Sequence, residues 1–408
     1  MRISTGQLYD RSIQAVLENQ GDLSDVQTQL ASGKKLLRPS DDPVGAAQVI
    51  RLTEEIDLIA QYKKNSNILT NNMEQEETIL SSVTTAVNRA RVLMVQAGNG
   101  IINTDDRKAI SIEIEQIRDQ VFDLMNTRNA AGEYIFAGTQ SASPAFVQNQ
   151  SASGNKYTFQ GDSGANLIQI SNTMQLANNN SGKAVFEDVL ARLKANITGS
   201  SGVTEASLTV DQQGAFDKFL KANFDAVVPA NNAYQVTIIS ANQVEVSHVA
   251  SGSVLETVDF ASGVPFSFKG LSFDISGNPG DTVNFQLEAP KKQNIADTLN
   301  NFVLALKDSN ISQTAYDEAL KDALIGVDNS LTSIGNATSV IGGRLNVNQA
   351  VLGANLDLEI ANKSARSSIE EVDYAEAVSE LSRQEAALEA ALATFARVTG
   401  TSLFDFIR

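Results

Sequence analysis

The residues that could do nucleophilic or acid–base chemistry are few in this chain. The sequence contains a single histidine, His248, and no cysteine. A zinc site made of two or three histidines, a thiolate nucleophile and a disulfide are therefore excluded, and a Ser-His-Asp triad would have to use His248. That residue lies in the alternating run Val244–Val249, which is typical of a β-strand, so we interpret it as an ordinary strand histidine.

Two other patterns could carry chemistry, and both have simpler explanations. Ser32 and Lys35 match the S-x-x-K motif, but the companion motifs S-D-N and K-T-G are absent from the sequence, which favours a chance match at a helix end. Adjacent acids could bind a cation or transfer a proton. Each such pair lies beside an expected helix start or on a solvated helix face: Asp41–Asp42, Asp105–Asp106 and Glu370–Glu371. The sequence thus predicts no enzymatic activity, no metal and no cofactor.

The charge balance excludes further classes of protein. Lysine and arginine total 31 and aspartate and glutamate total 48, which gives a formal net charge of −17. Nucleic acids and anionic membrane surfaces are disfavoured as partners, because binding to phosphates needs cations. No apolar run reaches the ~18 residues of a membrane span. The segment Met1–Asp10 has no basic region followed by an apolar core, so we expect no cleaved signal peptide.

The two ends of the chain carry apolar residues at heptad spacing, the a/d pattern of helices that pack along a seam. The front stripe consists of Tyr9, Val16, Leu23, Leu30 and Leu37. The back stripe consists of Tyr374, Val378, Leu381, Leu388, Leu392 and Phe395. Similar stripes occupy residues 52–94 and 320–352. Between Leu352 and Tyr374 the register shifts, which we interpret as a stutter.

Helix punctuation and composition divide the chain further. Asp42 suits an N-cap and Pro43 the first helical position, so we expect a helix from Pro43 to Ala97, about 80 Å long. Another helix should begin at Thr104. From Gly138 to Ala289 the chain is rich in Gly, Ser, Asn and Thr and carries short alternating runs, typical of strands joined by turns. These runs are residues 157–159, 234–239, 271–275 and 283–287, with possible short helices at 183–197 and 211–227.

These patterns predict a mainly α protein with a β-rich insertion. We expect an elongated rod of several domains, in which the terminal helices pack together as a coiled coil. The expected domains are a terminal coiled-coil domain (1–42 and 360–408), a long-helix bundle (43–137 and 292–359) and a β-rich outer domain (138–291).

The terminal stripes are the strongest candidates for an interface with other molecules. A lone pair of helices leaves much of its apolar stripe exposed, and short helices are marginal in water without packing. The chain also ends on an apolar segment, which includes Leu403 and Phe404. The expected interface residues are Tyr9, Val16, Leu23, Leu30, Leu37, Tyr374, Val378, Leu381, Leu388, Leu392, Phe395, Leu403 and Phe404.

Several short motifs, in order along the chain, resemble the bacterial flagellin superfamily. They are Met1–Thr5, Gln29–Lys35, Pro39–Pro43, Gly132–Gly138 and Gly343–Asn346. The resemblance covers the chain before and after the β-rich insertion, which itself matches weakly. Pro39 and Pro43, the Tyr134–Gly138 run and the turn Gly277–Asp281 favour the hook–filament junction branch of the superfamily over flagellin itself.

The resemblance implies a structural subunit that acts outside the cell, in the bacterial flagellum. Such a chain leaves the cytoplasm unfolded through the type III export apparatus, and an export chaperone would bind the helix at Val378–Phe395. Its subunits would form a ring between the first hook-associated protein and flagellin, and the ring would template filament growth. The alternative is a flagellin or flagellin-like filament subunit. A remote alternative is an adhesin or enzyme whose active surface is the β-rich insertion.

Overall fold

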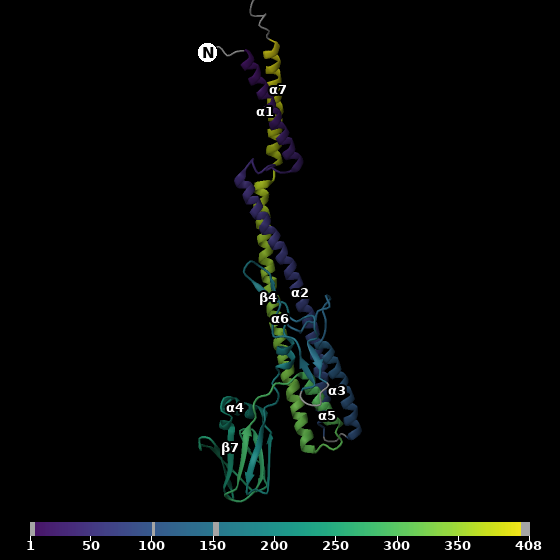
Figure 1. Ribbon diagram of the computed structural model, residues 1–408, viewed down its shortest axis with the longest axis vertical. Coiled ribbons are helices and arrows are strands. Elements are labelled where there is room, and N and C mark those ends of the chain that lie inside the picture. Colours follow the sequence, from purple (N-terminus) through teal and green to yellow (C-terminus); the bar gives the residue numbers. More distant parts are fainter. Residues whose placement is uncertain (1–4, 100–102, 150–154, 401–408) are drawn as a thin grey trace, which may run out of the picture. The chain divides into compact units, whose positions relative to one another are not determined.

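The computed structural model describes residues 5–99, 103–149 and 155–400, and these are mainly helical with a β-rich region in the middle of the chain (Figure 1). This confirms the predicted fold class. The chain divides into two compact units. The first comprises Met1–Thr70, Ile168–Leu176 and Asn346–Arg408, and the second comprises Asn71–Leu167 and Ala177–Leu345.

In the first unit, the helices from the two ends of the chain lie side by side (Figure 1). They are α1 (Thr5–Ser32) and α7 (Tyr374–Gly400). The longest helices, α2 (Pro43–Ala97) and α6 (Gln313–Glu370), contribute residues to both units. Within the first unit α2 and α6 run antiparallel, since the Asn362 side chain donates to Glu55 and the Asn348 side chain donates to the Ser66 carbonyl, both at 3.0 Å.

The helix starts follow the predicted chemistry. The Asp42 carboxylate accepts from the backbone N–H groups of Val44 and Gly45 at 3.1 and 2.9 Å, so Asp42 caps α2 and Pro43 begins it, as predicted. The helix α3 (Thr104–Met125) also begins at the predicted residue, with the Asn103 side chain as its cap. The predicted stutter is wrong, because α6 ends at Glu370 and α7 begins at Tyr374.

The second unit has a deeply buried helical core. Parts of α2 and α6 lie there with α3 and with α5 (Ile295–Lys307), which packs on α3. Side chains from all four helices are completely buried, so this core is the closed bundle that the heptad pattern predicted: Leu80, Val83 and Val87 of α2, Ile114 and Val121 of α3, Leu299 of α5, and Val327 and Ile341 of α6.

A β module of two sheets forms another part of the second unit. One sheet has the order β5-β12-β7-β8-β9 and the other β10-β11-β6, with antiparallel pairing throughout. β5 also contacts β6, and β9 contacts β10, so the sheets meet at both borders. The bounds are β5 Ala195–Ser201, β6 Glu205–Val210, β7 Ala233–Ser240, β8 Gln243–His248, β9 Val254–Asp259, β10 Phe266–Phe268, β11 Leu271–Ser276 and β12 Thr282–Leu287.

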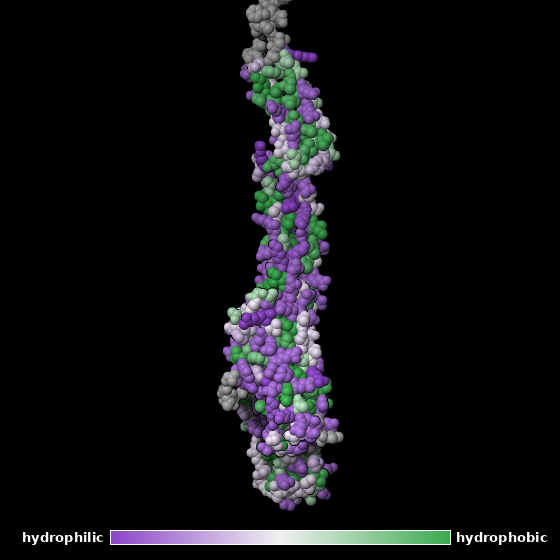
Figure 2. Space-filling model, turned by 90° about the vertical axis from the view of Figure 1, so that its right-hand side faces the viewer, coloured by the Kyte–Doolittle hydropathy of each residue, from purple (hydrophilic) through white to green (hydrophobic). Residues whose placement is uncertain are grey.

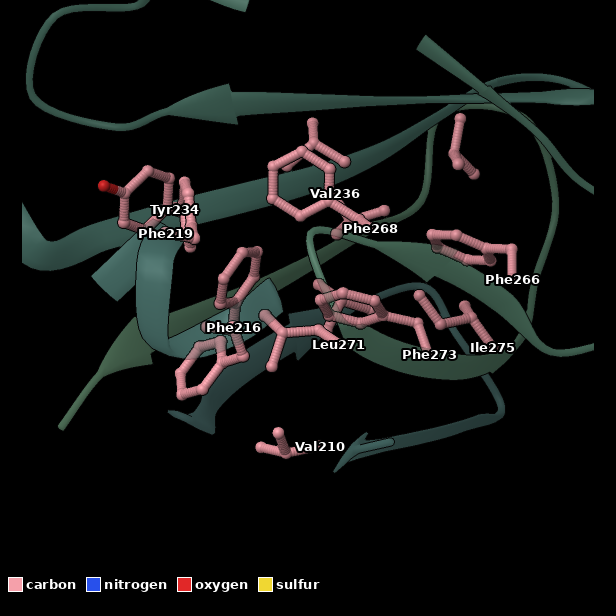
Figure 3. Close-up of a cluster of buried hydrophobic side chains, with 14 of the residues drawn as sticks. Val210, Phe216, Phe219, Tyr234, Val236, Phe266, Phe268, Leu271, Phe273 and Ile275 are labelled. Carbon is pink, nitrogen blue, oxygen red and sulfur yellow. The ribbon is translucent and has the colours of Figure 1, made fainter. Parts of the chain in front are cut away.

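Aromatic side chains fill the interior of the module (Figure 3). Phe273 stacks on Phe266 and meets Phe285 edge-on, while the helix α4 (Gln213–Asn223) adds Phe216 and Phe219 from one side. The four runs predicted as strands are all strands, and α4 lies within the predicted helix 211–227. The predicted helix 183–197 is wrong, since the chain makes only a π-helical turn at Lys183–Glu187 and then enters β5.

Two small hairpins complete the fold. β1 (Phe146–Gln148) pairs with β2 (Tyr157–Phe159), and β3 (Leu167–Gln169) pairs with β4 (Gln175–Ala177). In the first unit, side chains of α2 and α6 hold the second hairpin through hydrogen bonds at 2.8 Å from Tyr62 to the Asn172 side chain and from Asn355 to the Ile170 carbonyl. A short 3₁₀ helix at Pro229–Asn232 precedes β7.

Candidate assembly surface

The seam between α1 and α7 is only partly closed. Val16, Leu23 and Leu30 face it from α1 and are half-buried, as are Leu381, Leu388 and Phe395 on α7. The rings of Tyr9 and Phe395 lie 5.5 Å apart. Two seam residues that the heptad selection missed, Val26 and Ala377, are the apolar side chains of this pair classed as buried. The pair thus has a thin core with one layer of contacts.

Several large apolar side chains of the pair are exposed to solvent. Leu17 is 61% exposed, Tyr374 59% and Val378 52%, and Leu392 and Tyr9 are also largely exposed. Figure 2 shows hydrophobic surface over this part of the molecule on the face drawn. Exposed apolar side chains that gather on one element indicate an interface with a partner more often than scattered ones do.

The structure therefore divides the predicted interface residues into two groups. Six of them, Val16, Leu23, Leu30, Leu381, Leu388 and Phe395, close the pair from inside, and four, Tyr9, Tyr374, Val378 and Leu392, remain exposed. Leu37 is half-buried in the link between α1 and α2, and Leu403 and Phe404 lie outside the described residues. The sequence analysis missed Leu17 because it follows the heptad position of Val16 and was not part of the stripe.

Both chain segments leave the helical conformation at the same level of the first unit, and they are tied together there. The Lys35 N–H donates to the Glu370 carbonyl at 2.7 Å, and the Val372 N–H donates to the Gly33 carbonyl at 3.1 Å. Gly33 has a φ of 70°, and a Cβ at this position would lie 3.1 Å from the Tyr374 hydroxyl. Glycine is therefore required by the conformation and leaves room for Tyr374. We call residues 33–35 and 370–372 the joint.

Charges at the joint and on α7 serve to hold helices. Lys34 forms an ion pair with Glu370, and Asp373 caps α7 by accepting from the Ala375 N–H at 2.9 Å. Hydrogen bonds from Arg383 and Gln384 lower the pKa of the Glu380 carboxyl. Each of these contacts lies on the surface, where an ion pair adds little stability.

The residues examined for catalysis have structural roles. The Ser32 hydroxyl donates to the Gln29 carbonyl and accepts from the Lys34 N–H, so the S-x-x-K match marks a helix end. Asp105 and Asp106 lie in the first turn of α3, where negative charge stabilises the helix. The residues described include no group of three or more His, Asp or Glu side chains that could hold a metal ion. Within the same residues, no helix is long and apolar enough to cross a membrane.

His248 is likewise held by ordinary contacts. It ends β8, and its Nε2 lies 2.7 Å from the Asn231 carbonyl. A carbonyl only accepts, so Nε2 carries the proton and Nδ1, 2.8 Å from the Ser251 hydroxyl, accepts from it. The ring packs on Tyr234 with centroids 5.2 Å apart. This confirms the interpretation of His248 as a strand histidine.

Comparison with other proteins shows what the N-terminal part of the chain is similar to. The model of the family described as the bacterial flagellin N-terminal helical region matches residues 3–141, which include α1, α2 and α3. The front part of the chain is therefore similar to the N-terminal helical region of bacterial flagellins.

Two curated proteins that are similar to this chain share the name flagellar hook-associated protein 3. Flagellar hook-associated protein 3 of Salmonella typhimurium is 35% identical over 148 residues, which cover 36% of this chain and 47% of the relative. The protein of the same name from Escherichia coli is 29% identical over 211 residues, which cover 52% of this chain and 65% of the relative. The chain thus spans about half of one and just under two thirds of the other.

Solved structures agree on the fold. The crystal structure of flagellar hook associated protein-3 from Legionella pneumophila aligns with a TM-score of 0.60 at 23% identity, over 79% of this chain and 98% of that one. The chain is thus similar in sequence to proteins named hook-associated protein 3 over part of their length, and it shares the fold of the Legionella pneumophila structure.

Proposed function

We propose that this protein is a structural subunit of the bacterial flagellum, at the junction between the hook and the filament. Subunits would form a ring with the first hook-associated protein on one side and flagellin on the other, and the ring would template filament growth. The observation that carries the proposal is the exposed apolar face of the α1–α7 pair, because no part of the described chain covers these side chains. The similarity to proteins named hook-associated protein 3 supports the same assignment.

We propose a separate role for each of the three domains. Residues 1–42 and 360–408 form the assembly domain, residues 43–137 and 292–359 form the bundle, and residues 138–291 form the variable outer domain. The boundary at residue 360 lies inside α6, which continues to Glu370. The joint supplies a natural limit for the assembly domain, because both chain segments are interrupted there.

Export completes the proposed route. The chain would leave the cytoplasm unfolded through the flagellar type III apparatus, without a cleaved signal peptide, and reach the outside of the cell. An export chaperone would cover Val378–Phe395 before assembly. The exposure of Val378 and Leu392 supports this role, since both side chains are accessible to a partner on a helix that is otherwise half-buried.

Electron microscopy of assembly separates this proposal from the filament alternative, which the flagellin region match favours. Purified chain is tested alone with precipitant, and with detached hooks that carry the first hook-associated protein. A thin cap on the hooks that then allows flagellin to grow supports the junction role. Long filaments from the chain alone would instead make it a flagellin.

A charge substitution tests whether the exposed face carries assembly. We expect Leu392→Asp to abolish binding to hooks while circular dichroism stays unchanged, because Leu392 lies outside the seam. Thr394→Asp is the matched control, since it adds the same charge to an exposed residue of α7 two positions away and should still bind. Equal hook binding by Leu392→Asp and the control would contradict an assembly role for this face.

A further inference from the structure

The β module has a hydrophobic core of its own. The buried aromatic and aliphatic side chains of its two sheets form one cluster, and every residue of that cluster and every partly buried side chain packed against it lies between Leu190 and Leu287 (Figure 3). The neighbouring helix α6 therefore contributes no side chain to it. Domains that share no apolar core are free to move against each other unless polar contacts fix them.

The chain connects the module to the helices through a two-stranded neck. The Ala191 N–H donates to the Lys291 carbonyl, and the Glu288 N–H donates to the Lys194 carbonyl, both at 2.9 Å. These bonds join the incoming and outgoing segments to each other, so they keep the neck together. They do not set the direction in which the module points.

One buried side chain joins the module to α6. The Arg192 side chain is only 1% exposed. On the module side its Nε donates to the Gln213 side chain at 2.8 Å, and its Nη2 donates to the Val210 carbonyl at 3.2 Å. On the α6 side its Nη1 lies 2.6 Å from a Glu318 oxygen and 3.2 Å from an Asp322 oxygen. The planar guanidinium thus bonds both bodies at once.

The other ion pairs at this place are more exposed, and the Asn329 side chain of α6 also donates to the Leu190 carbonyl, just before the neck, at 2.7 Å. Lys194 also pairs with Asp322, but both side chains are more than a third exposed. Lys321 lies 3.9 Å from Asp211, again between exposed groups, and such pairs contribute little. A cavity of about 470 Å³, lined by residues that include Arg192, Lys291 and Asp322, separates the neck from the helices. The neck and the helices thus leave open space beside the buried Arg192.

We propose that Arg192 is the positioning residue that fixes the direction of the β module relative to α6. Without the guanidinium, the module loses the contacts that the buried Arg192 makes with Glu318 and Asp322 of α6. The cavity beside Arg192 then leaves space for the neck to bend. The module then moves as a folded body, because its core does not depend on α6. This inference is independent of the proposed function.

Distance measurement between two spin labels on the full chain tests the proposal. The sequence has no cysteine, so Ala241→Cys in the β7–β8 turn and Asn336→Cys on α6 place labels at two exposed positions without a competing thiol. We expect Arg192→Met to broaden the distance distribution by about twofold or more. Lys291→Met is the control: Lys291 lies in the neck and pairs only with Glu288 at the surface, and the distribution should not change.

A second variant protects the test against misfolding. The double variant Glu318→Gln with Asp322→Asn removes the anions on α6 and leaves the whole module unaltered, so it should also broaden the distribution. Amide hydrogen exchange of β7 and β12 reports whether the module is folded. If Arg192→Met unfolds the module, the double variant decides the question. An unchanged distribution in a double variant with a folded module would overturn the proposal.

Discussion

The α1–α7 pair and the helical bundle of the second unit carry the same heptad spacing but differ in burial. In the bundle, Leu80, Val87 and Val327 are completely buried. In the pair, Leu23 and Leu388 at equivalent positions are only half-buried. The bundle surrounds each stripe with helices on several sides, whereas each terminal helix has one neighbour. A heptad pattern thus indicates which face of a helix packs, whereas the number of adjacent helices determines how far the side chains on that face are buried.

The difference also separates stability from assembly. A closed bundle gains its stability within one chain, because apolar surface is removed from water there. A pair with an exposed apolar face gains the rest only when other helices cover it. Substitutions in the bundle, in the seam and at the joint test this contrast.

The largest effect is expected in the bundle core. Val87→Asp places a carboxylate among completely buried apolar side chains and should lower the free energy of unfolding of the bundle by more than about 4 kcal/mol. Denaturant unfolding, with hydrogen exchange of α2 amides, measures it. Val92→Asp, on the same helix but 56% exposed, should stay within about 0.5 kcal/mol of the wild type. Similar losses for both variants would show that the bundle is not closed.

The next largest effect is a dependence of stability on pH, and it comes from a buried carboxyl in the bundle. Glu76 is buried on α2, its Oε1 accepts from the Asn180 side chain at 2.9 Å, and its Oε2 has no hydrogen-bond partner. Burial raises its pKa from 4.5 to about 7. The unfolded chain therefore releases this proton first as pH rises, and stability falls between pH 4.5 and 7, by about 3 kcal/mol in all.

The variant Glu76→Gln isolates that contribution. It removes the ionisation, so at pH 8 it should be more stable than the wild type by up to about 3 kcal/mol, with no gain at pH 4. Unfolding curves at the two pH values measure the difference. The surface carboxyl of Glu380 provides the contrast, because its pKa is lowered and its contribution is lost as pH falls. Parallel stability profiles for the wild type and Glu76→Gln would contradict the burial of a protonated Glu76.

A smaller loss is expected in the seam of the terminal pair. Leu388→Ala removes half-buried methyl groups and should destabilise the pair by about 1 kcal/mol. Hydrogen exchange of α1 amides measures the loss, since α1 packs on α7. Leu392→Ala, on the exposed side, should change exchange by less than about 0.5 kcal/mol. A larger effect of Leu392→Ala would mean that Leu392, and not Leu388, lies in the seam with α1.

The smallest effect is expected at the joint. Lys34→Ala removes the ion pair with Glu370, but Lys34 is 56% exposed, so the loss should be about 0.5 kcal/mol or less. The backbone bonds of the joint remain. Exchange of the Val372 and Lys35 amides measures it, with Lys35→Ala as the control for loss of an exposed positive charge. A large loss from Lys34→Ala alone would mean that the ion pair, and not the backbone bonds, holds the joint.

Local chemistry made much of the fold predictable. The α2 helix has its predicted bounds because Asp42, Pro43 and the glycines beyond Ala97 give strong start and stop signals. The strands that alternate between apolar and polar residues were also found. The predicted helix 183–197 extended too far, into the start of β5 at Ala195, since a short apolar pattern does not distinguish a helix from a strand.

The errors and omissions concern contacts between distant parts of the chain. The register shift before Tyr374 was interpreted as a stutter, because a sequence pattern does not reveal that residues 33–35 pair there with residues 370–372. The buried roles of Arg192 and Glu76 also depend on groups more than a hundred residues away. For the proposed assembly surface, the stripes marked two helices that pack on each other, but only the paired structure shows which side of each helix remains uncovered.

The joint also has a mechanical consequence. An unbroken coiled coil transmits twist along its length, because every turn of one helix is interlocked with the next. At the joint, two backbone hydrogen bonds and one surface ion pair replace that interlocking. Torsion applied to α2 and α6 will therefore reach α1 and α7 only weakly. In the proposed assembly, the terminal pair could therefore adopt a rotation imposed by neighbouring subunits without forcing the long helices to unwind.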